Sequence, residues 1–578
     1  MREVCWRMNL LENLNEQQKV ACKKENNLLL IACPGSGKTR TIVHRLAYYG
    51  TKYATSRKIN IAITYTNRAS DEMENRLQDM GVDFYNIWTG TIHQFCMNFI
   101  IRPYSIYSER LRFGYRVIDE YEQREYGRLI AHDLGIDIKY GKYFENKRIV
   151  AEYKNRLIQN HEIDFNDILE ISWDLLKDKE YIAENIAKLI RSINVDEYQD
   201  TNEYQYQILS LLYKANNKIN LAFVGDANQA IYTGLGGIAK DRTELENDFD
   251  TSFEELYLSG CYRSTQEVID FYSKFAVKTL NNIFSFMSEH KYETKIVYDK
   301  SISTDVLSAN IASIIKEQLE LGIKASEICV LAPQWHLLYP MANKLRDILP
   351  DVPFNAPDIT PFKYDPLNPF YLMSWLLFST VRESGRLRRK RATELLNILI
   401  NDYGEQIRSG VDNVGLIEYI NRQRRLFSGT DGIDCLKMVI ENTFKWLNIN
   451  LDKNPRLLQC HDSYFGKIEN RIQTSELMTS IEDLQKCFQE KDGVVFTTIH
   501  AVKGEEYETV IAFGLLQGYL PNWQSIYDKS INDDEEAKRL LYVLFSRAKS
   551  NIYYFSETGR VTKKGKKQLL PTLSLIHI

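Results

Sequence analysis

The sequence lacks an apolar run long enough to cross a membrane. The longest apolar stretch, FYLMSWLLF at residues 370–378, is far shorter than the ~20 residues of a membrane span. The N-terminal segment MREVCWRMNLLENLNEQQK has no apolar region of the kind found in signal peptides. These absences predict a soluble, cytoplasmic protein with no membrane partner.

Paired cysteines are also absent. The nine cysteines are scattered along the chain without a C-x-x-C pair. An odd and unpatterned set is typical of reduced thiols in a reducing compartment, and it argues against a zinc or iron–sulfur site.

An excess of positive charge is the third absence. The chain carries 73 Lys+Arg against 77 Asp+Glu, a formal net charge of −4, which excludes a strongly basic nucleic-acid-binding protein. A local cationic channel remains compatible with this balance. Apolar residues make up 44% and charged residues 26% of the 578 residues, as in ordinary globular proteins.

Short apolar runs alternate with helical patterns in two regions of the chain, and this alternation predicts parallel sheets with helical crossovers. The expected strands include residues 27–32, 59–64, 192–197, 220–226, 295–299, 328–333, 493–500 and 509–514. Polar, helical stretches interrupt both regions, so we expect two α/β cores, each with a mainly helical insertion. The expected boundaries are 1–101, 102–160, 161–257, 258–378, 379–489 and 490–578, in which the second and fifth segments are the insertions.

A glycine-rich segment, ACPGSGKT at residues 32–39, stands between an expected strand and an expected helix. In this context the backbone N–H groups of Gly35, Ser36 and Gly37 can surround a β-phosphate. Lys38 would reach the β- and γ-phosphates, and the Thr39 hydroxyl would bind Mg²⁺. The alternative is a glycine-rich turn that only happens to precede a helix.

Two adjacent acids follow another expected strand, in VDEYQD at residues 195–200. Asp196, at the strand end, is placed to hold Mg²⁺, and Glu197 can orient and deprotonate an attacking water. Such a pair is more often a solvated turn, but the strand and the upstream phosphate loop favour catalysis.

Further segments accompany the phosphate loop and the acid pair in a fixed order along the chain. In order they are LNEQQKVA (14–21), ACPGSGKT (32–39), TYTNRAS (64–70), TGTIHQF (89–95), DEYQD (196–200), VGDANQAIY (224–232), LSGCYRST (258–265), TTIHAVKGEEYETV (497–510) and EEAKRLLYVLFSRAK (535–549). This order of motifs resembles the superfamily-one DNA helicases of the UvrD/PcrA/Rep type. The resemblance implies two RecA-like P-loop cores with parallel sheets, ATP and Mg²⁺ in the cleft between them, and 3′→5′ movement on single-stranded or tailed duplex DNA.

The resemblance implies a role for residues around the nucleotide. Gln229 would sense the γ-phosphate, while Arg263 and Arg547 would act on it as arginine fingers supplied in cis. The remaining nucleotide contacts would be Gln18 and Tyr262 on adenine, Arg40 beside the nucleotide, Glu506 on the ribose, and Ala32, Cys33 and Pro34 in the loop.

The same resemblance implies a track for single-stranded DNA. Tyr65 and Tyr232 match positions that touch bases, while Thr91 and His93 would contact the backbone. His500 belongs to a motif that couples the nucleotide state to the grip on DNA. Core packing is the alternative for both tyrosines in a chain with 36 Tyr.

The sequence departs from the family pattern at several positions. Gly234 and Leu235 stand where a base-stacking aromatic and an Arg are expected, and Pro333 replaces an Arg that can hold DNA. The basic run RLRRKR (386–391) fits duplex phosphates and a solvated helix face equally well, and KKGKK (563–567) fits a solvated tail.

These departures leave two functions open. The first is an ATP-dependent DNA helicase. The second is a DNA-sensing ATPase subunit that works beside a nuclease in phage defence, as in Gabija-type systems, with weak or no unwinding of its own. A nucleotide kinase or a purely structural protein is disfavoured, because Arg263, Glu506 and Arg547 stand in motif context far downstream of the phosphate loop.

Overall fold

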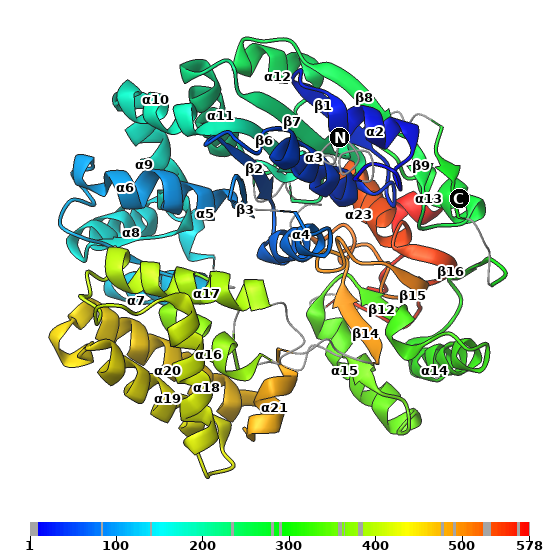
Figure 1. Ribbon diagram of the computed structural model, residues 1–578. Coiled ribbons are helices and arrows are strands. Elements are labelled where there is room, and N and C mark those ends of the chain that lie inside the picture. Colours follow the sequence, from blue (N-terminus) through cyan, green and yellow to red (C-terminus); the bar gives the residue numbers. More distant parts are fainter. Residues whose placement is uncertain are drawn as a thin grey trace.

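The computed structural model describes residues 10–82, 85–138, 142–232, 236–278, 282–287, 292–355, 361–362, 365–379, 385–475, 479–488, 493–523, 533–562 and 567–576. Within these ranges the chain forms two parallel sheets and two helical units, and this arrangement confirms the expected α/β class (Figure 1). No helix in the described part of the chain is long and apolar enough to cross a membrane.

The first core contains a six-stranded sheet with the order β3-β2-β6-β7-β1-β8, and every neighbouring pair is parallel. Its strands are β1 (Leu28–Ala32), β2 (Ile59–Thr64), β3 (Ile87–Thr91), β6 (Ile190–Asp196), β7 (Asn220–Gly225) and β8 (Glu254–Leu258). Its helices are α2 (Glu16–Lys23), α3 (Lys38–Lys52), α4 (Asn67–Asp79), α5 (Ile92–Phe95), α9 (Phe165–Asp178), α10 (Glu180–Leu189), α11 (Glu203–Ala215) and α12 (Arg242–Phe249).

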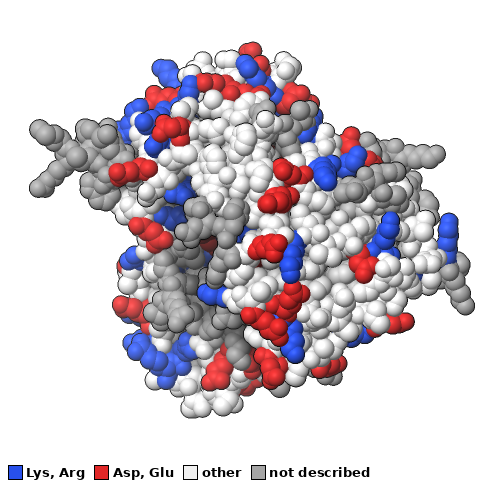
Figure 2. Space-filling model, turned by 90° about the vertical axis from the view of Figure 1, so that its right-hand side faces the viewer, with Lys and Arg blue, Asp and Glu red and all other residues white. Residues whose placement is uncertain are grey.

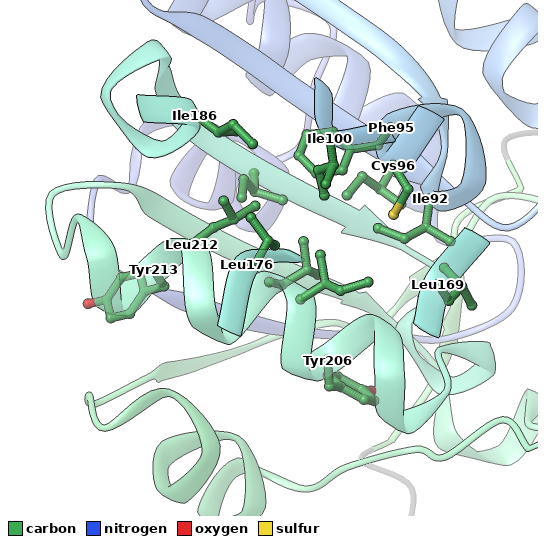
Figure 3. Close-up of a cluster of buried hydrophobic side chains, with 14 of the residues drawn as sticks. Ile92, Phe95, Cys96, Ile100, Leu169, Leu176, Ile186, Tyr206, Leu212 and Tyr213 are labelled. Atoms are coloured by element: carbon green, nitrogen blue, oxygen red, sulfur yellow. The ribbon is translucent and has the colours of Figure 1, made fainter. Parts of the chain in front are cut away.

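Figure 3 shows the apolar core on one face of this sheet, where side chains of α9, α10 and α11 meet those of α5 and the π-helix at Cys96–Ile101. The central strands β1 and β7 are mostly apolar and almost fully buried, because a parallel sheet covered by helices is buried on both faces. Burial of this kind holds the carboxyl ends of the strands rigidly, and these ends carry the site.

The first insertion is a small helical unit with its own apolar cluster around Ile130 and Tyr153. Its elements are α6 (Arg102–Tyr104), β4 (Arg116–Val117), α7 (Glu120–Asp133), α8 (Lys147–Gln159) and β5 (Glu162–Ile163).

The second core repeats the parallel architecture with the strand order β11-β16-β15-β12-β14-β13. The strands are β11 (Lys295–Asp299), β12 (Ile328–Ala332), β13 (Phe354–Asn355), β14 (Val494–Thr498), β15 (Tyr507–Ala512) and β16 (Ala548–Phe555). A short ladder of β9 (Gly260–Cys261) and β10 (Phe284–Ser285) lies apart from this sheet. The helices are α13 (Gln266–Ser273), α14 (Thr304–Glu320), α15 (Trp335–Ile348), α23 (Asp533–Phe545) and α24 (Leu573–Ile576).

The second helical unit begins earlier than the sequence indicated. Helix α16 (Pro369–Phe378), which the expected boundary at residue 378 places in the second core, packs inside the apolar cluster of the helical unit. All of its residues are buried, so its sequence has no polar face that would show where it docks. The other helices are α17 (Gly385–Asn397), α18 (Asn413–Leu426), α19 (Gly432–Leu447), α20 (Pro455–Ser475) and α21 (Ile481–Lys486).

The two helical units lie side by side in Figure 1, and Lys467 of α20 lies 3.5 Å from Glu122 of α7. Partly buried ion pairs join them: Arg102 makes a two-pronged contact with Asp402 at 2.7 and 2.8 Å, and Lys467 contacts Asp119 at 2.9 Å. The units therefore form a continuous wall beside the first core.

Candidate nucleotide site and nucleic-acid track

The phosphate loop has the backbone geometry that its glycines permit. Gly35 and Gly37 have φ of +72° and +78°, a left-handed region that residues with a Cβ rarely adopt. A Cβ on Gly35 would also lie 2.6 Å from the Cβ of Arg263. Ala32 ends β1, and the turn is closed by the Ser36 hydroxyl, which donates to the Cys33 carbonyl at 2.7 Å. The loop opens directly into α3, whose N-terminal N–H groups favour an anion.

Two carboxylates stand beside the loop at the end of β6. The Thr39 hydroxyl donates to Asp196 Oδ2 at 3.2 Å, and Lys38 Nζ lies 3.5 Å from Glu197 Oε1. A hydroxyl and a carboxylate at this spacing suit Mg²⁺, which prefers oxygen ligands. Glu197 itself has φ of 53°, and Gln199 donates a hydrogen bond to its carboxylate.

The pKa values of the two carboxylates are shifted in opposite directions. Burial raises the pKa of Asp196, and the neighbouring Glu197 charge raises it further. Burial also pushes up the pKa of Glu197, but Lys38 and Lys503 outweigh burial and lower it below its usual value. Glu197 is therefore anionic at neutral pH, and an anionic carboxylate is the form that can accept a proton from water.

The second core supplies cations to the same place. Arg547, whose residue exposure is 2%, donates to Gln229 Oε1 at 2.8 Å, and Lys503 donates to the Gln229 carbonyl at 2.8 Å. Lys503 also pairs with the buried Asp200. Burial and the nearby Arg263 lower the pKa of Arg547 to about 9, so its guanidinium stays charged at neutral pH. The charge of Arg547, like that of Lys38, helps to lower the pKa of Glu197.

The other expected finger, Arg263, lies against the loop from the second core. Its Nη1 donates to the Ser546 carbonyl at 2.9 Å, and its Nε donates to Glu506 Oε2 at 3.0 Å. Glu506 is thus beside the nucleotide site but is paired with an arginine in this structure.

The expected adenine contacts lie at the open end of the loop. Tyr262 donates its backbone N–H to the Gly35 carbonyl at 2.9 Å, and its hydroxyl accepts a hydrogen bond from Asn15. Arg40 reaches the Asn13 carbonyl at 2.9 Å. Gln18 is only 2% exposed and donates to the Ser36 carbonyl at 2.9 Å, so in this structure it ties α2 to the phosphate loop.

Four of the five expected DNA residues, Tyr65, Thr91, His93 and Tyr232, line one cavity of about 510 Å³ at the carboxyl edge of the first sheet, whereas His500 lines a second cavity. The rings of Tyr65 and Tyr232 stack with centroids 4.8 Å apart and planes 25° apart. Tyr232 donates to the His500 carbonyl at 3.1 Å, and the ammonium of Lys503 lies 5.4 Å from its ring. The cavity is lined by Tyr65, Thr91, His93, Tyr232, Asp196, Glu197 and Asp200, among others.

Thr91 and His93 are more constrained than their assignment as backbone contacts suggested. The Thr91 hydroxyl accepts from the Gln94 N–H at 3.3 Å and caps α5. Burial lowers the pKa of His93 to about 4, so the imidazole is neutral at physiological pH.

The second core contains a further cavity, and several aromatic residues that line it stand in no motif. A cavity of about 890 Å³ adjoins His500 and is walled by His336, Tyr519 and Trp523, with Pro333 at its edge. Their signal in the sequence is weak, because aromatic residues spread over 188 positions mark a common pocket only after the chain folds.

Three basic side chains of the run at 386–391 contact other parts of the chain. Lys390 pairs with Glu74 at 2.9 Å, and Arg391 pairs with Asp71 at 2.7 Å, both on helix α4 of the first core. Arg388 donates to the Leu376 carbonyl at 2.8 Å. Neither duplex binding nor a solvated helix face describes these three side chains.

Three further expectations lie outside the described residues: those on Gly234, Leu235 and residues 563–566. On the face shown in Figure 2, Lys/Arg and Asp/Glu side chains are interspersed, in keeping with the net charge of −4.

Comparison with known proteins agrees with this geometry. The UvrD/REP helicase N-terminal domain matches residues 14–146 and 139–250, and the UvrD-like helicase C-terminal domain matches residues 406–557. An ATP-dependent DNA helicase PcrA from Staphylococcus epidermidis is 24% identical over 98% of this chain and 87% of its own length. A PcrA from Staphylococcus aureus is 24% identical over 98% of this chain and 86% of its own. Two cores that meet over one phosphate loop, together with these matches, show that the chain belongs to the UvrD/PcrA-like family of ATP-dependent DNA helicases.

Proposed function

We propose that this chain is a cytoplasmic motor that hydrolyses ATP to move 3′→5′ on single-stranded DNA and to open tailed duplexes. One observation supports it best: Glu197 lies between Lys38 of the first core and Lys503 of the second, and it lines the same cavity as Tyr65 and Tyr232. The direction of movement rests on the resemblance of the ordered motifs.

Residues of both cores take part in the proposed hydrolysis of ATP. Glu197 orients and deprotonates the attacking water, while Gln229 sits between Asp226 and Arg547 at the contact of the cores. Thr39 and Asp196 would hold Mg²⁺, which when bound neutralises phosphate charge. Arg263 and Arg547 stabilise the charge that develops on the transferring phosphoryl group.

Lys503 would link this chemistry to DNA. It contacts Asp200 and the Gln229 carbonyl, lies 4.0 Å from Glu197, and sits beside the Tyr232 ring. A base that separates Tyr65 from Tyr232 would shift the surroundings of this ammonium, and with it the charge at Glu197.

Replacement of Lys38 by Ala tests the phosphate site. We expect Lys38→Ala to abolish ATP hydrolysis and to leave the thermal unfolding midpoint close to that of the wild type. Lys19→Ala is the control, because Lys19 pairs with its helical neighbour Glu16 on the surface. Full turnover by the Lys38 variant would refute the assignment.

Replacement of Glu197 by Gln separates binding from hydrolysis. The variant should bind ATP and lose about 10²–10⁴-fold in turnover, because the amide cannot accept the proton. Glu246→Gln, on the exposed side of α12, should leave turnover unchanged. Rapid hydrolysis by Glu197→Gln would remove it as the base.

A second candidate function is a DNA-sensing ATPase subunit that works beside a nuclease and unwinds weakly or not at all. It is favoured by the engagement of Arg388, Lys390 and Arg391 inside the chain, which removes them from duplex binding. Strand displacement on 3′-tailed and 5′-tailed duplexes decides between the two functions. Robust opening of the 3′-tailed substrate alone supports the motor, and DNA-stimulated hydrolysis without opening supports the sensor.

A further inference from the structure

Two large aromatic side chains are exposed together at the open end of the phosphate loop. Tyr262 is 42% exposed and Phe286 is 47% exposed. Their ring centroids lie 5.6 Å apart and their planes meet at 78°. The two rings therefore form a nearly right-angled corner, which offers a flat ligand one face and one edge.

The backbone of Phe286 is fixed before any ligand arrives. Phe286 donates its N–H to the Cys261 carbonyl at 2.7 Å, directly after the two-residue ladder between β10 and β9. The neighbouring Ser285 donates its hydroxyl to the Ser264 carbonyl at 2.8 Å. These bonds tie the segment to the strand that leads into Tyr262, so the two rings keep their relation.

The absence of a side chain at Gly260 makes room for the Phe286 ring. A Cβ on Gly260 would lie 2.4 Å from Cε2 of Phe286, closer than real Cβ contacts come. The ring occupies the space that any other residue at position 260 would fill.

The corner is continuous with the phosphate site. Asn15, at the N-cap of α2, donates to the Tyr262 hydroxyl at 2.7 Å, and Gln18 of the same helix donates to the Ser36 carbonyl at 2.9 Å. The Tyr262 backbone also contacts the Gly35 carbonyl. A nucleotide with its phosphates in the loop would carry its base toward this corner.

We propose that Phe286 contacts the nucleotide base, as the second wall of a two-walled aromatic site that takes the purine of the nucleoside triphosphate. The base would stack on one ring and meet the edge of the other. This inference rests on the proposed function, because it requires a triphosphate in the loop. Of the two rings in this corner, the sequence motifs pointed only to that of Tyr262.

Equilibrium binding of two ligands to the full chain tests the proposal. ATP carries a base, and inorganic triphosphate does not. We expect Phe286→Ala to raise the Kd for ATP about tenfold, which is the worth of one aromatic stack, and to leave the Kd for triphosphate unchanged. Phe286→Tyr should retain the affinity for ATP. The matched control is Phe284→Ala, which removes a 53% exposed ring from β10, the strand directly before Phe286, and should change neither Kd.

A second variant changes the position of the Phe286 ring without replacing Phe286. Gly260→Ala should displace Phe286 and produce the same selective loss of ATP affinity. Unchanged ATP affinity in Phe286→Ala would overturn the proposal, and so would an equal loss for ATP and triphosphate, because equal loss means damage to the loop. If the proposed function is wrong and the loop does not bind phosphates, the result is different: the Kd for triphosphate would be the same for the wild type and for Lys38→Ala.

Discussion

At the scale of single residues, His93 shows how burial limits what a motif residue can do. Its imidazole lines the cavity beside Tyr65, and burial lowers its pKa to about 4. A neutral ring can donate one hydrogen bond to a DNA phosphate but cannot pair with it as a cation. The motif match predicted the place of His93 and could not predict its charge.

The lowered pKa of His93 predicts an acid-sensitive contribution to stability. Between pH 6.5 and 4 the imidazole of His93 is neutral in the folded protein, whereas it accepts a proton in the unfolded chain. The free energy of unfolding therefore falls as the pH drops through this window. At pH 5 the loss is about 2 kcal/mol relative to neutral pH. His93→Gln should remove this part of the pH dependence in denaturant unfolding at pH 7.5 and pH 5. An identical pH dependence in both proteins would contradict the burial of the imidazole.

Local sequence patterns predicted much of the candidate site, but they could not predict the contacts between residues far apart in the chain. Lys38 and Glu197 stand in motifs whose strand context is legible in the sequence, and the structure brings them within 3.5 Å. The contact of Arg391 with Asp71 was not legible, because 320 positions separate the two residues. The same holds for Phe286, which stands in no motif.

At the scale of elements, the strands with apolar runs were predictable and the connections between units were not. Strands β1, β2 and β12 begin and end within one residue of the expected ranges. Strand β16 was missed, although its sequence AKSNIYYF is rich in β-forming residues, because the preceding motif drew the interpretation toward a helix end. Helix α16 was placed in the wrong unit because it is apolar on every side.

The contact between α17 and α4 makes a testable claim about elements. Arg391, whose side chain is 2% exposed, pairs with Asp71, and α4 begins two residues after Tyr65. Arg391→Ala leaves Asp71 without its partner, so the free energy of local opening of α4 should fall by about 3 kcal/mol. Amide hydrogen exchange of α4 measures this loss. The control is Lys437→Ala in an exposed ion pair, which should change stability by less than about 1 kcal/mol. Unchanged protection of the α4 amides from hydrogen exchange in Arg391→Ala would show that the Arg391–Asp71 ion pair does not stabilise α4.

At the scale of the whole molecule, the sheets alone do not make the site. The phosphate loop and its carboxylates come from the first core, whereas Arg263, Lys503 and Arg547 come from the second. The order of the motifs predicted this division, because the phosphate loop and the acid pair precede the expected boundary after residue 257, whereas the motifs with Arg263, Lys503 and Arg547 follow it. The packing of the two helical units against each other, and of α17 against α4, could not be predicted from the sequence and is seen only in the structure.

The central claim is that the second core completes the catalytic site of the first, and Arg547 carries it most directly. The measurement is DNA-stimulated ATP turnover by Arg547→Ala, with ATP affinity and the thermal unfolding midpoint recorded on the same preparation. An arginine finger supplied in cis predicts a loss of about 10³-fold or more in turnover, with ATP binding retained and the fold intact. Turnover within a few-fold of the wild type by a folded Arg547→Ala protein would contradict the account.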